Sequence, residues 1–140
     1  MTLLDPTTHL GRRAAQRLAD EQVVWLTTVD PAGVPQPTPV WFWWTGTEAY
    51  VVSRPRQAKL RNVRAHPAVA LAFDTDAGGD DVQVLTGTAV VEDGPLPADV
   101  RAAYDAKYAG GYGRLGVTAE DFHADYSVVL RITPERLRGW

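Results

Sequence analysis

The stretch VVSRPRQAKLRNVRAHPAVALAF, residues Val51–Phe73, decides how this 140-residue chain is organised. It opens on a short apolar strand around Tyr50–Val52, breaks at Ser53-Arg54-Pro55, and continues into a short helix. A second apolar strand, Ala68–Phe73, follows Pro67. The stretch therefore predicts a strand, a helix and a second strand at the centre of the chain.

The helical part of this stretch concentrates positive charge. Five of the fourteen basic residues fall within 54–64, and no acidic residue interrupts 49–73. Pro55 suits the first turn of a helix, where its missing N–H is no loss. Ser53 is placed to cap the free amides of that turn. We expect the helix to begin at about Pro55.

A helical wheel gives two of these basic residues a common direction. Arg56 lies on the apolar face near the N-terminal end, and Lys59 flanks that face. A helix start at which free amides and cations converge predicts an anion site. The alternative is a solvated basic face. We prefer that alternative for Arg61 and Arg64, which point further from the apolar side.

The totals restrict the class of protein. The length suits one domain over 1–140. A net charge of −3 and a pI near 5.5 do not indicate nucleic-acid or membrane binding by the whole molecule. The chain has no cysteine, which excludes disulfides and thiolate metal sites. With no signal peptide and no membrane-spanning apolar run, we expect a cytoplasmic protein.

Most of the chain is predicted to form strand-turn-strand units. Strands are predicted at 23–29, 35–44, 49–53, 68–73, 82–92 and 126–132, with 136–140 as an extension or a return to the sheet. Helices are predicted at 8–20, 97–109 and 118–124. Gly110-Gly111-Tyr112-Gly113 is expected to end the second of these helices, and Gly87 predicts a bulge or a close backbone approach. The pattern predicts a mainly β fold, an antiparallel barrel of about six strands flanked by helices.

The strand at 35–44, PQPTPVWFWW, has two unusual features. Prolines at 35, 37 and 39 cannot donate ladder hydrogen bonds, so this part is expected at a sheet edge or beside a ligand. Alternation places Trp41 and Trp43 on one face and Phe42 and Trp44 on the other. One pair would fill the barrel and the other a subunit interface. The alternative is that one tryptophan lines a cofactor or substrate pocket.

The central segment also carries a motif. Ser53 is followed by Lys59, Arg61-Asn62 and Pro67, and then by an apolar strand. This pattern resembles the phosphate-binding segment of the pyridoxamine 5'-phosphate oxidase-like flavoprotein superfamily, and more narrowly its actinobacterial branch that binds the deazaflavin coenzyme F420 instead of FMN. The resemblance covers Ala19–Val91 and continues more loosely to the end of the chain. It implies a six-stranded antiparallel split β-barrel, FMN-binding-like, that pairs as a homodimer.

The resemblance also implies a coenzyme site. Its cofactor-binding residues would be Gln36, Thr38, Val40, Val52, Ser53, Arg56, Ala58, Lys59 and Gln83. Arg56 and Lys59 would hold the phosphate, the proline-rich strand would lie along the ring system, and Gln83 would reach the cofactor of a neighbouring subunit. Many FMN-binding relatives carry a second basic residue where this chain has Ala58, which favours F420. FMN is the alternative cofactor.

The implied reaction is a two-electron reduction of a small unsaturated or quinone-like molecule by the deazaflavin. The catalytic residues are unknown from the sequence, although Tyr112 and Tyr126 are candidate proton donors. His9, His66 and His123 lack metal-ligand spacing, so no metal site is predicted.

Other classes of function stay open. An FMN-dependent oxidoreductase, or a non-catalytic flavin or haem binder, would use the same barrel. Trp41 and Trp43 with the basic segment would suit single-stranded nucleic acid, but the acidic pI counts against this alternative. The expected partners are a second copy of the chain and a small-molecule substrate, with no nucleic acid and no membrane.

Overall fold

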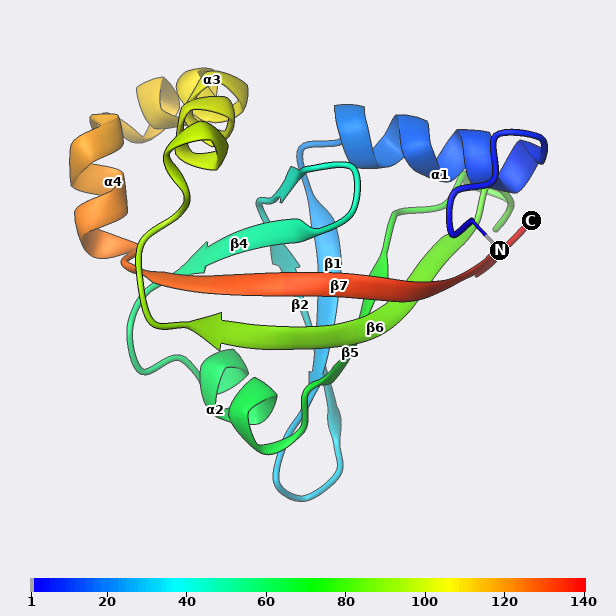
Figure 1. The fold of residues 1–140 in the computed structure, drawn as a ribbon, viewed down its shortest axis with the longest axis horizontal. Helices are drawn as coiled ribbons and strands as arrows, with labels where there is room; N and C mark the ends of the chain where they lie inside the picture. Colours follow the sequence, from blue (N-terminus) through cyan, green and yellow to red (C-terminus); the bar gives the residue numbers. More distant parts are fainter. Residues whose placement is uncertain (1) are drawn as a thin grey trace.

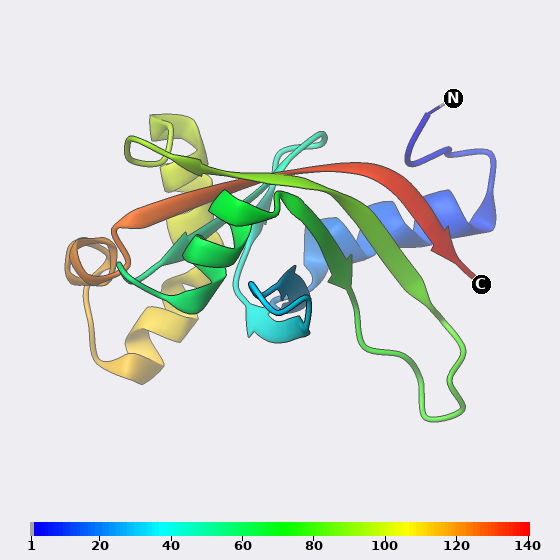
Figure 2. The ribbon, with the colours of Figure 1, turned by 90° about the horizontal axis from the view of Figure 1, so that it is seen from below.

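The computed structural model of the protein describes residues 2–140, so Met1 of the single domain expected over 1–140 lies outside the described residues. Its helices and strands are α1 His9–Asp20, β1 Val24–Val29, β2 Pro35–Val40, β3 Trp43–Trp44, β4 Ala49–Ser53, α2 Ala58–Ala65, β5 Ala68–Ala72, β6 Gln83–Glu92, α3 Ala98–Leu115, α4 Ala119–Asp125 and β7 Val128–Gly139. The strands form one antiparallel sheet in the order β2-β1-β5-β6-β7-β4-β3 (Figure 1). The long strands β6 and β7 curve across the molecule (Figure 2). This confirms the predicted antiparallel, helix-flanked sheet.

Two apolar clusters hold the fold together. The first fills the inside of the curved sheet and includes Leu60 and Val63 of α2, which packs against β1 and β6. The second joins α3 and α4 to the opposite face of β4 and β7. All five residues of β4 are buried, because its alternate side chains enter the two clusters in turn. Tyr50 and Val52 belong to the second cluster, which sets α3 and α4 beside the end of β4.

Helix α2 begins three residues later than predicted. It starts at Ala58 after Gln57, which makes no side-chain cap, and the Ser53 hydroxyl donates instead to the Arg54 carbonyl at 2.8 Å. Arg56 has a φ of 61° and directly follows Pro55. Proline followed by a left-handed residue is typical of a type II turn, so the chain turns here before it becomes helical. The wheel position predicted for Arg56 was therefore wrong.

The predicted strand 35–44 is two strands, which raises the count from six to seven. The ladder stops at Val40 and resumes at Trp43 because Phe42 bonds to α3. Its N–H donates to the Tyr108 hydroxyl at 2.8 Å, and its carbonyl accepts from Lys107 Nζ at 3.0 Å. The predicted alternation of the aromatic side chains is still confirmed. Phe42 and Trp44 join the first cluster, and Trp41 and Trp43 pack against the second.

Helix α3 ends six residues later than predicted, because the glycines at 110, 111 and 113 lie inside it. At Gly111 an added Cβ would lie 2.6 Å from the Trp41 ring, so glycine lets the indole approach the helix closely. Packing outweighs the helix-breaking propensity of glycine here. The helix ends at Gly116, whose φ of 69° is the usual left-handed stop.

The last strand and its neighbour confirm the expectation for Gly87. The β6–β7 register shifts between Thr86 and Gly87, and a Cβ at Gly87 would lie 2.1 Å from the Thr133 carbonyl oxygen. The predicted segments 126–132 and 136–140 form one continuous strand, β7, that spans this irregularity.

Candidate functional site

A cavity of about 280 Å³ opens where β2, β4 and α2 meet α3 and α4. Its lining residues are Pro39, Val40, Trp41, Val52, Lys59, Tyr104, Leu115, Phe122 and Tyr126, and we call it the Lys59 cavity. The structure thus brings together three residues predicted for the cofactor site, namely Val40, Val52 and Lys59. The cavity is slightly smaller than the roughly 300–1,000 Å³ typical of small-molecule sites, so it suits part of a large coenzyme.

Lys59 is the one cation on this lining and is half-buried. Burial lowers the pKa of its ammonium group, and no acidic side chain among residues 2–140 offsets this effect. The charged form is therefore short of solvation and of a counterion. An anion bound at the cavity would supply both.

The start of α2 adds hydrogen-bond donors close to Lys59. Because Gln57 gives no side-chain cap, the N–H groups of Ala58 and Lys59 are free for a ligand, whereas the Leu60 N–H donates to the Gln57 carbonyl at 3.1 Å. Arg56 is exposed on the preceding turn, and its carbonyl accepts from the Arg61 guanidinium at 3.3 Å. Ser53 is fully buried at the end of β4. The basic segment thus provides an exposed arginine, free amides and a half-buried lysine within a few residues.

One wall of the Lys59 cavity is aromatic. Trp41 lies flat on Tyr108 of α3, with ring centroids 4.5 Å apart and planes 7° apart. The ring centroid of Phe122 of α4 lies 5.7 Å from that of Trp41, and the Phe122 ring stacks on Tyr126 with centroids 4.4 Å apart. The Trp41 ring is therefore held in place by side chains of both α3 and α4. This arrangement supports the hypothesis that one tryptophan lines a pocket.

Not every predicted site residue borders this cavity. Gln36 is exposed on β2 and bonds Asp30, and Thr38 lies half-buried on the same edge strand. Gln83 is 1% exposed, and its amide accepts from Arg17 at 2.6 Å and donates to Asp81 at 3.1 Å. The structure uses Gln83 inside its own subunit. Its predicted contact with the cofactor of a neighbouring subunit stays a prediction.

Arg17 is a polar centre that the sequence analysis missed. It is 5% exposed, and its guanidinium also donates to the carbonyls of Asp74 and Asp81 while its carbon lies 4.9 Å from the Phe73 ring centroid. Arg17 lies on the buried face of α1 with Ala14 and Leu18, and this spacing was the available sign of a buried arginine. Arg17 fixes the loop between β5 and β6, away from the Lys59 cavity.

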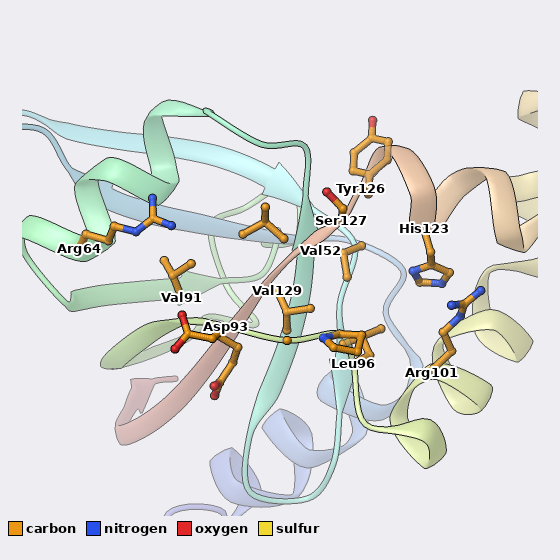
Figure 3. Close-up of a pocket in the computed structure, with 14 residues that line it drawn as sticks. Val52, Arg64, Val91, Asp93, Leu96, Arg101, His123, Tyr126, Ser127 and Val129 are labelled. Atoms are coloured by element: carbon orange, nitrogen blue, oxygen red, sulfur yellow. The ribbon is translucent and has the colours of Figure 1, made fainter.

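A larger groove of about 470 Å³ adjoins the Lys59 cavity and shares Val52 and Tyr126 with it. We call it the Arg101 groove. Arg64 of α2 stands at one end, and Arg101 and His123 stand at the other (Figure 3). Its floor is apolar and includes Val91, Leu96 and Val129.

Asp105 organises the α3 end of the Arg101 groove. Its carboxylate accepts from the Tyr112 hydroxyl and lies 2.7 Å from His123 Nε2, with Arg101 at 3.4 Å. Burial alone would raise the pKa of Asp105, but the bonds from Tyr112 and His123 outweigh burial and lower it. Tyr112 is thus occupied by Asp105, whereas Tyr126 faces both cavities. No metal site is indicated within residues 2–140, where no three His, Cys, Asp or Glu side chains gather.

The remaining basic residue of the segment has its own partner. Arg54 pairs with Asp125 at 2.8 Å and lies over the Tyr126 ring at 5.0 Å.

Over the described residues no helix has the length and apolar character needed to cross a membrane.

Three residues that line the Lys59 cavity were not predicted from the sequence, namely Tyr104, Leu115 and Phe122. Tyr104, Tyr108 and Tyr112 recur every four residues on α3, which puts three aromatic rings on one helix face. This spacing was the available signal for an aromatic wall. The contact of that wall with β2 and β4 is long-range, so spacing alone did not reveal it.

Comparison with known proteins identifies the fold. Residues 10–140 match the family model for pyridoxamine 5'-phosphate oxidase. An F420 reductase is 24% identical, with a TM-score of 0.66 and coverage of 88% of this chain and 94% of that one. HutZ, a haem storage protein from Vibrio cholerae, is 18% identical (TM-score 0.68, coverage 94% and 95%). A pyridoxamine 5'-phosphate oxidase-like protein from Listeria innocua is 23% identical (TM-score 0.69, coverage 91% and 94%).

These likenesses confirm the split β-barrel that the motif implied. No curated protein sequence matches the chain significantly.

Proposed function

Because this chain belongs to the pyridoxamine 5'-phosphate oxidase family, we propose that it is an oxidoreductase that binds coenzyme F420 at the Lys59 cavity. The observation that carries the proposal is Lys59 itself, a half-buried ammonium group without a counterion on an otherwise apolar and aromatic lining. The similarity to an F420 reductase supports the choice of coenzyme. Ala58, in place of a second basic residue before Lys59, supports it further.

The residues fit the phosphate end of such a coenzyme. Lys59 and the free N–H groups of Ala58 and Lys59 would hold the phosphate, with Arg56 closing from the exposed turn. Ser53 is fully buried and its hydroxyl donates to the Arg54 carbonyl, so it would support this turn from behind. A phosphate would restore to Lys59 the solvation that burial removes. The lowered pKa of Lys59 marks an ammonium group that a bound anion would stabilise.

The edge strand β2 fits the ring end. It pairs with β1 alone, and its prolines at 35, 37 and 39 have no N–H. The ladder to β1 must therefore use the N–H groups of Gln36, Thr38 and Val40, since a residue directs its N–H and carbonyl to the same side of a strand. The outer edge then presents carbonyl groups only. Such an edge would orient a ring that carries N–H donors.

The bound deazaflavin would supply a hydride from C5, and it reacts poorly with oxygen. The acceptor would therefore be a small unsaturated or quinone-like molecule, which the hydride reduces by two electrons. The chain would position and enclose the reactants. Trp41, Phe122 and Tyr126 would exclude water from the ring, and Val52 would form the floor between the cavity and the Arg101 groove.

A second copy of the chain would complete the site. The Lys59 cavity of one chain is small, and large apolar side chains are exposed on β1 and beyond it, among them Val23, Trp25 and Val34. A groove of about 460 Å³ lined mainly by β1, β5 and β6 offers further apolar surface. We expect a homodimer with its cofactor sites at the subunit boundary. Light scattering at micromolar concentration checks this, and a monomeric mass would contradict it.

Titration with F420, FMN and haem tests the proposed cofactor. We expect F420 to bind most tightly, FMN to bind more weakly and haem to bind only nonspecifically. The fluorescence of F420 reports its binding. Tight haem binding with no F420 binding would overturn the proposal and favour a function like that of the haem storage relative.

A further inference from the structure

Tyr104 carries a hydroxyl group that has no hydrogen-bond partner in the part of the chain that the structure describes. The side chain is 1% exposed, with its ring 4.8 Å from that of Tyr108 and stacked at 6.3 Å on Phe122. The next two tyrosines on the same face of α3 are bonded. Tyr108 donates to the Gln22 carbonyl at 2.7 Å, and Tyr112 donates to Asp105 at 2.7 Å. Within residues 2–140 nothing accepts from or donates to the Tyr104 hydroxyl.

The Tyr104 oxygen must therefore reach open space. Among the described residues, every fully buried side-chain nitrogen or oxygen has a hydrogen-bond partner. An oxygen without a partner is then not fully enclosed, although the rest of the side chain is. The cavity that Tyr104 lines is the Lys59 cavity. A polar atom at the end of a buried ring that lines a cavity is placed to bond whatever fills that cavity.

We propose that Tyr104 donates a hydrogen bond to an oxygen atom of a planar ring bound in the Lys59 cavity. The neighbouring walls suit a flat ring. Trp41 is held rigidly by Tyr108, and Phe122 lies 5.7 Å from Trp41 on the same lining. Leu115, 61% exposed, stands at the rim and leaves the entrance apolar.

The hydroxyl acts as a donor and not as a source of protons. Burial raises the pKa of Tyr104 well above its ordinary value, because a phenolate would lie among the aromatic rings of Tyr108, Tyr112 and Phe122. The neutral phenol therefore persists at any working pH. The ligand class that matches is a planar molecule with a carbonyl or quinone oxygen.

This inference rests on the proposed function only for the origin of that oxygen. The carbonyl could belong to the coenzyme ring or to a quinone-like substrate, and the chemistry at Tyr104 is the same for both. Tyr104→Phe removes the hydroxyl and keeps the ring. Because the hydroxyl bonds no residue, the variant should keep the melting temperature of the wild type.

The test measures binding of two probes to the wild type and to Tyr104→Phe. Oxidised F420 is titrated by its fluorescence, and menadione is titrated without coenzyme by quenching of tryptophan fluorescence. Loss of one neutral hydrogen bond should weaken the binding of the probe that accepts it about two- to tenfold. The infrared carbonyl stretch of the bound probe should lie lower in the wild type than in the variant, which a merely structural role for Tyr104 would not produce.

The outcomes separate the two origins. Weaker F420 binding assigns the bond to the coenzyme, and weaker menadione binding assigns it to the substrate. Unchanged affinity and carbonyl frequency for both probes would overturn the role of Tyr104. If the wild type binds menadione but not F420, the proposed coenzyme fails while the Tyr104 inference is still decided by the menadione arm. If neither probe binds the wild type, both fail.

Discussion

Trp41 lies flat on Tyr108, with their ring centroids 4.5 Å apart and their planes inclined by 7°. The two residues come from the end of β2 and from the middle of α3, so this stack joins the sheet to the helix beside it. The Tyr108 hydroxyl adds hydrogen bonds to backbone groups of Phe42 and Gln22. The wall of the Lys59 cavity is thus fixed before any ligand binds, which lowers the cost of ordering it on binding.

Removing the Tyr108 hydroxyl should destabilise the protein. Tyr108→Phe leaves the buried Phe42 N–H and the Gln22 carbonyl without their partner. The expected loss in the free energy of unfolding is about 1–3 kcal/mol. Urea denaturation measures it, with Tyr104→Phe as the matched control because that hydroxyl bonds nothing. Equal stabilities for the two variants would show that the Tyr108 bonds contribute little.

Two glycines of α3 should respond to alanine with opposite signs. At Gly111 the new Cβ would lie 2.6 Å from the Trp41 ring, whereas nothing lies within 4 Å at Gly113. Gly113→Ala should stabilise the helix by about 0.5–1 kcal/mol through propensity alone. Gly111→Ala should gain the same amount and lose about 1–3 kcal/mol to overpacking, since Trp41 is held by Tyr108. Thermal melts of both variants give the comparison, and stabilisation by Gly111→Ala would mean that Trp41 moves freely.

Lys107 should make stability depend on pH. Burial against Phe42 and Tyr108 lowers its pKa in the folded protein from 10.5 to about 8. Below about pH 8 both states are protonated. Between pH 8 and 10.5 the unfolded chain binds more protons, so the free energy of unfolding rises with pH across this window. Discounted for the half of the group that water still reaches, the rise is about 1–2 kcal/mol.

Lys107→Met isolates that effect from other titrating groups. Unfolding in urea is followed at about pH 7.5 and at about pH 10 for the wild type and the variant. The wild type should gain stability relative to Lys107→Met at the higher pH. A constant difference between the two proteins would contradict the burial of the ammonium group.

Arg17 should be worth far more to stability than its neighbour Arg13. Arg17→Met leaves the carbonyls of Asp74 and Asp81 and the amide of Gln83 without their donor. We expect a loss of about 2–4 kcal/mol, together with faster proteolysis between β5 and β6. Arg13→Met also removes a contact with Asp81, but at the surface, so it should cost under about 1 kcal/mol. Similar losses for both variants would refute the buried clamp.

The sequence predicted the parts of the fold that local patterns control. Alternation placed Phe42 and Trp44 apart from Trp41 and Trp43, and Gly87 indicated the close approach of β6 and β7. The antiparallel sheet and its flanking helices followed from strand length and turn residues. Of the cofactor-site residues that the resemblance implied, Val40, Val52 and Lys59 line one cavity, and their contact with a cofactor stays a prediction.

The errors arise where distant residues replace local bonds. The strand at 35–44 divides because Phe42 bonds Tyr108, which is 66 positions away in the chain. Helix α3 continues through its glycines because Trp41 needs the room at Gly111. Tyr104 was missed for the same reason, since only the folded chain shows that its hydroxyl lacks a partner. The start of α2 differs because Pro55 and Arg56 form a turn.

The central claim is that Lys59 binds the phosphate of F420, and the most direct measurement is the dissociation constant of F420 for Lys59→Ala. Losing this charge-assisted contact should weaken binding by ~1.5–3 kcal/mol, or roughly ten- to a hundredfold. Arg61→Ala is the control, because it removes the same charge from the exposed side of the same helix. At fixed ionic strength and with unchanged melting curves, we predict a large loss for Lys59→Ala and a loss several times smaller for Arg61→Ala. Equal, small losses for the two variants would contradict the account and leave the basic segment as a solvated surface.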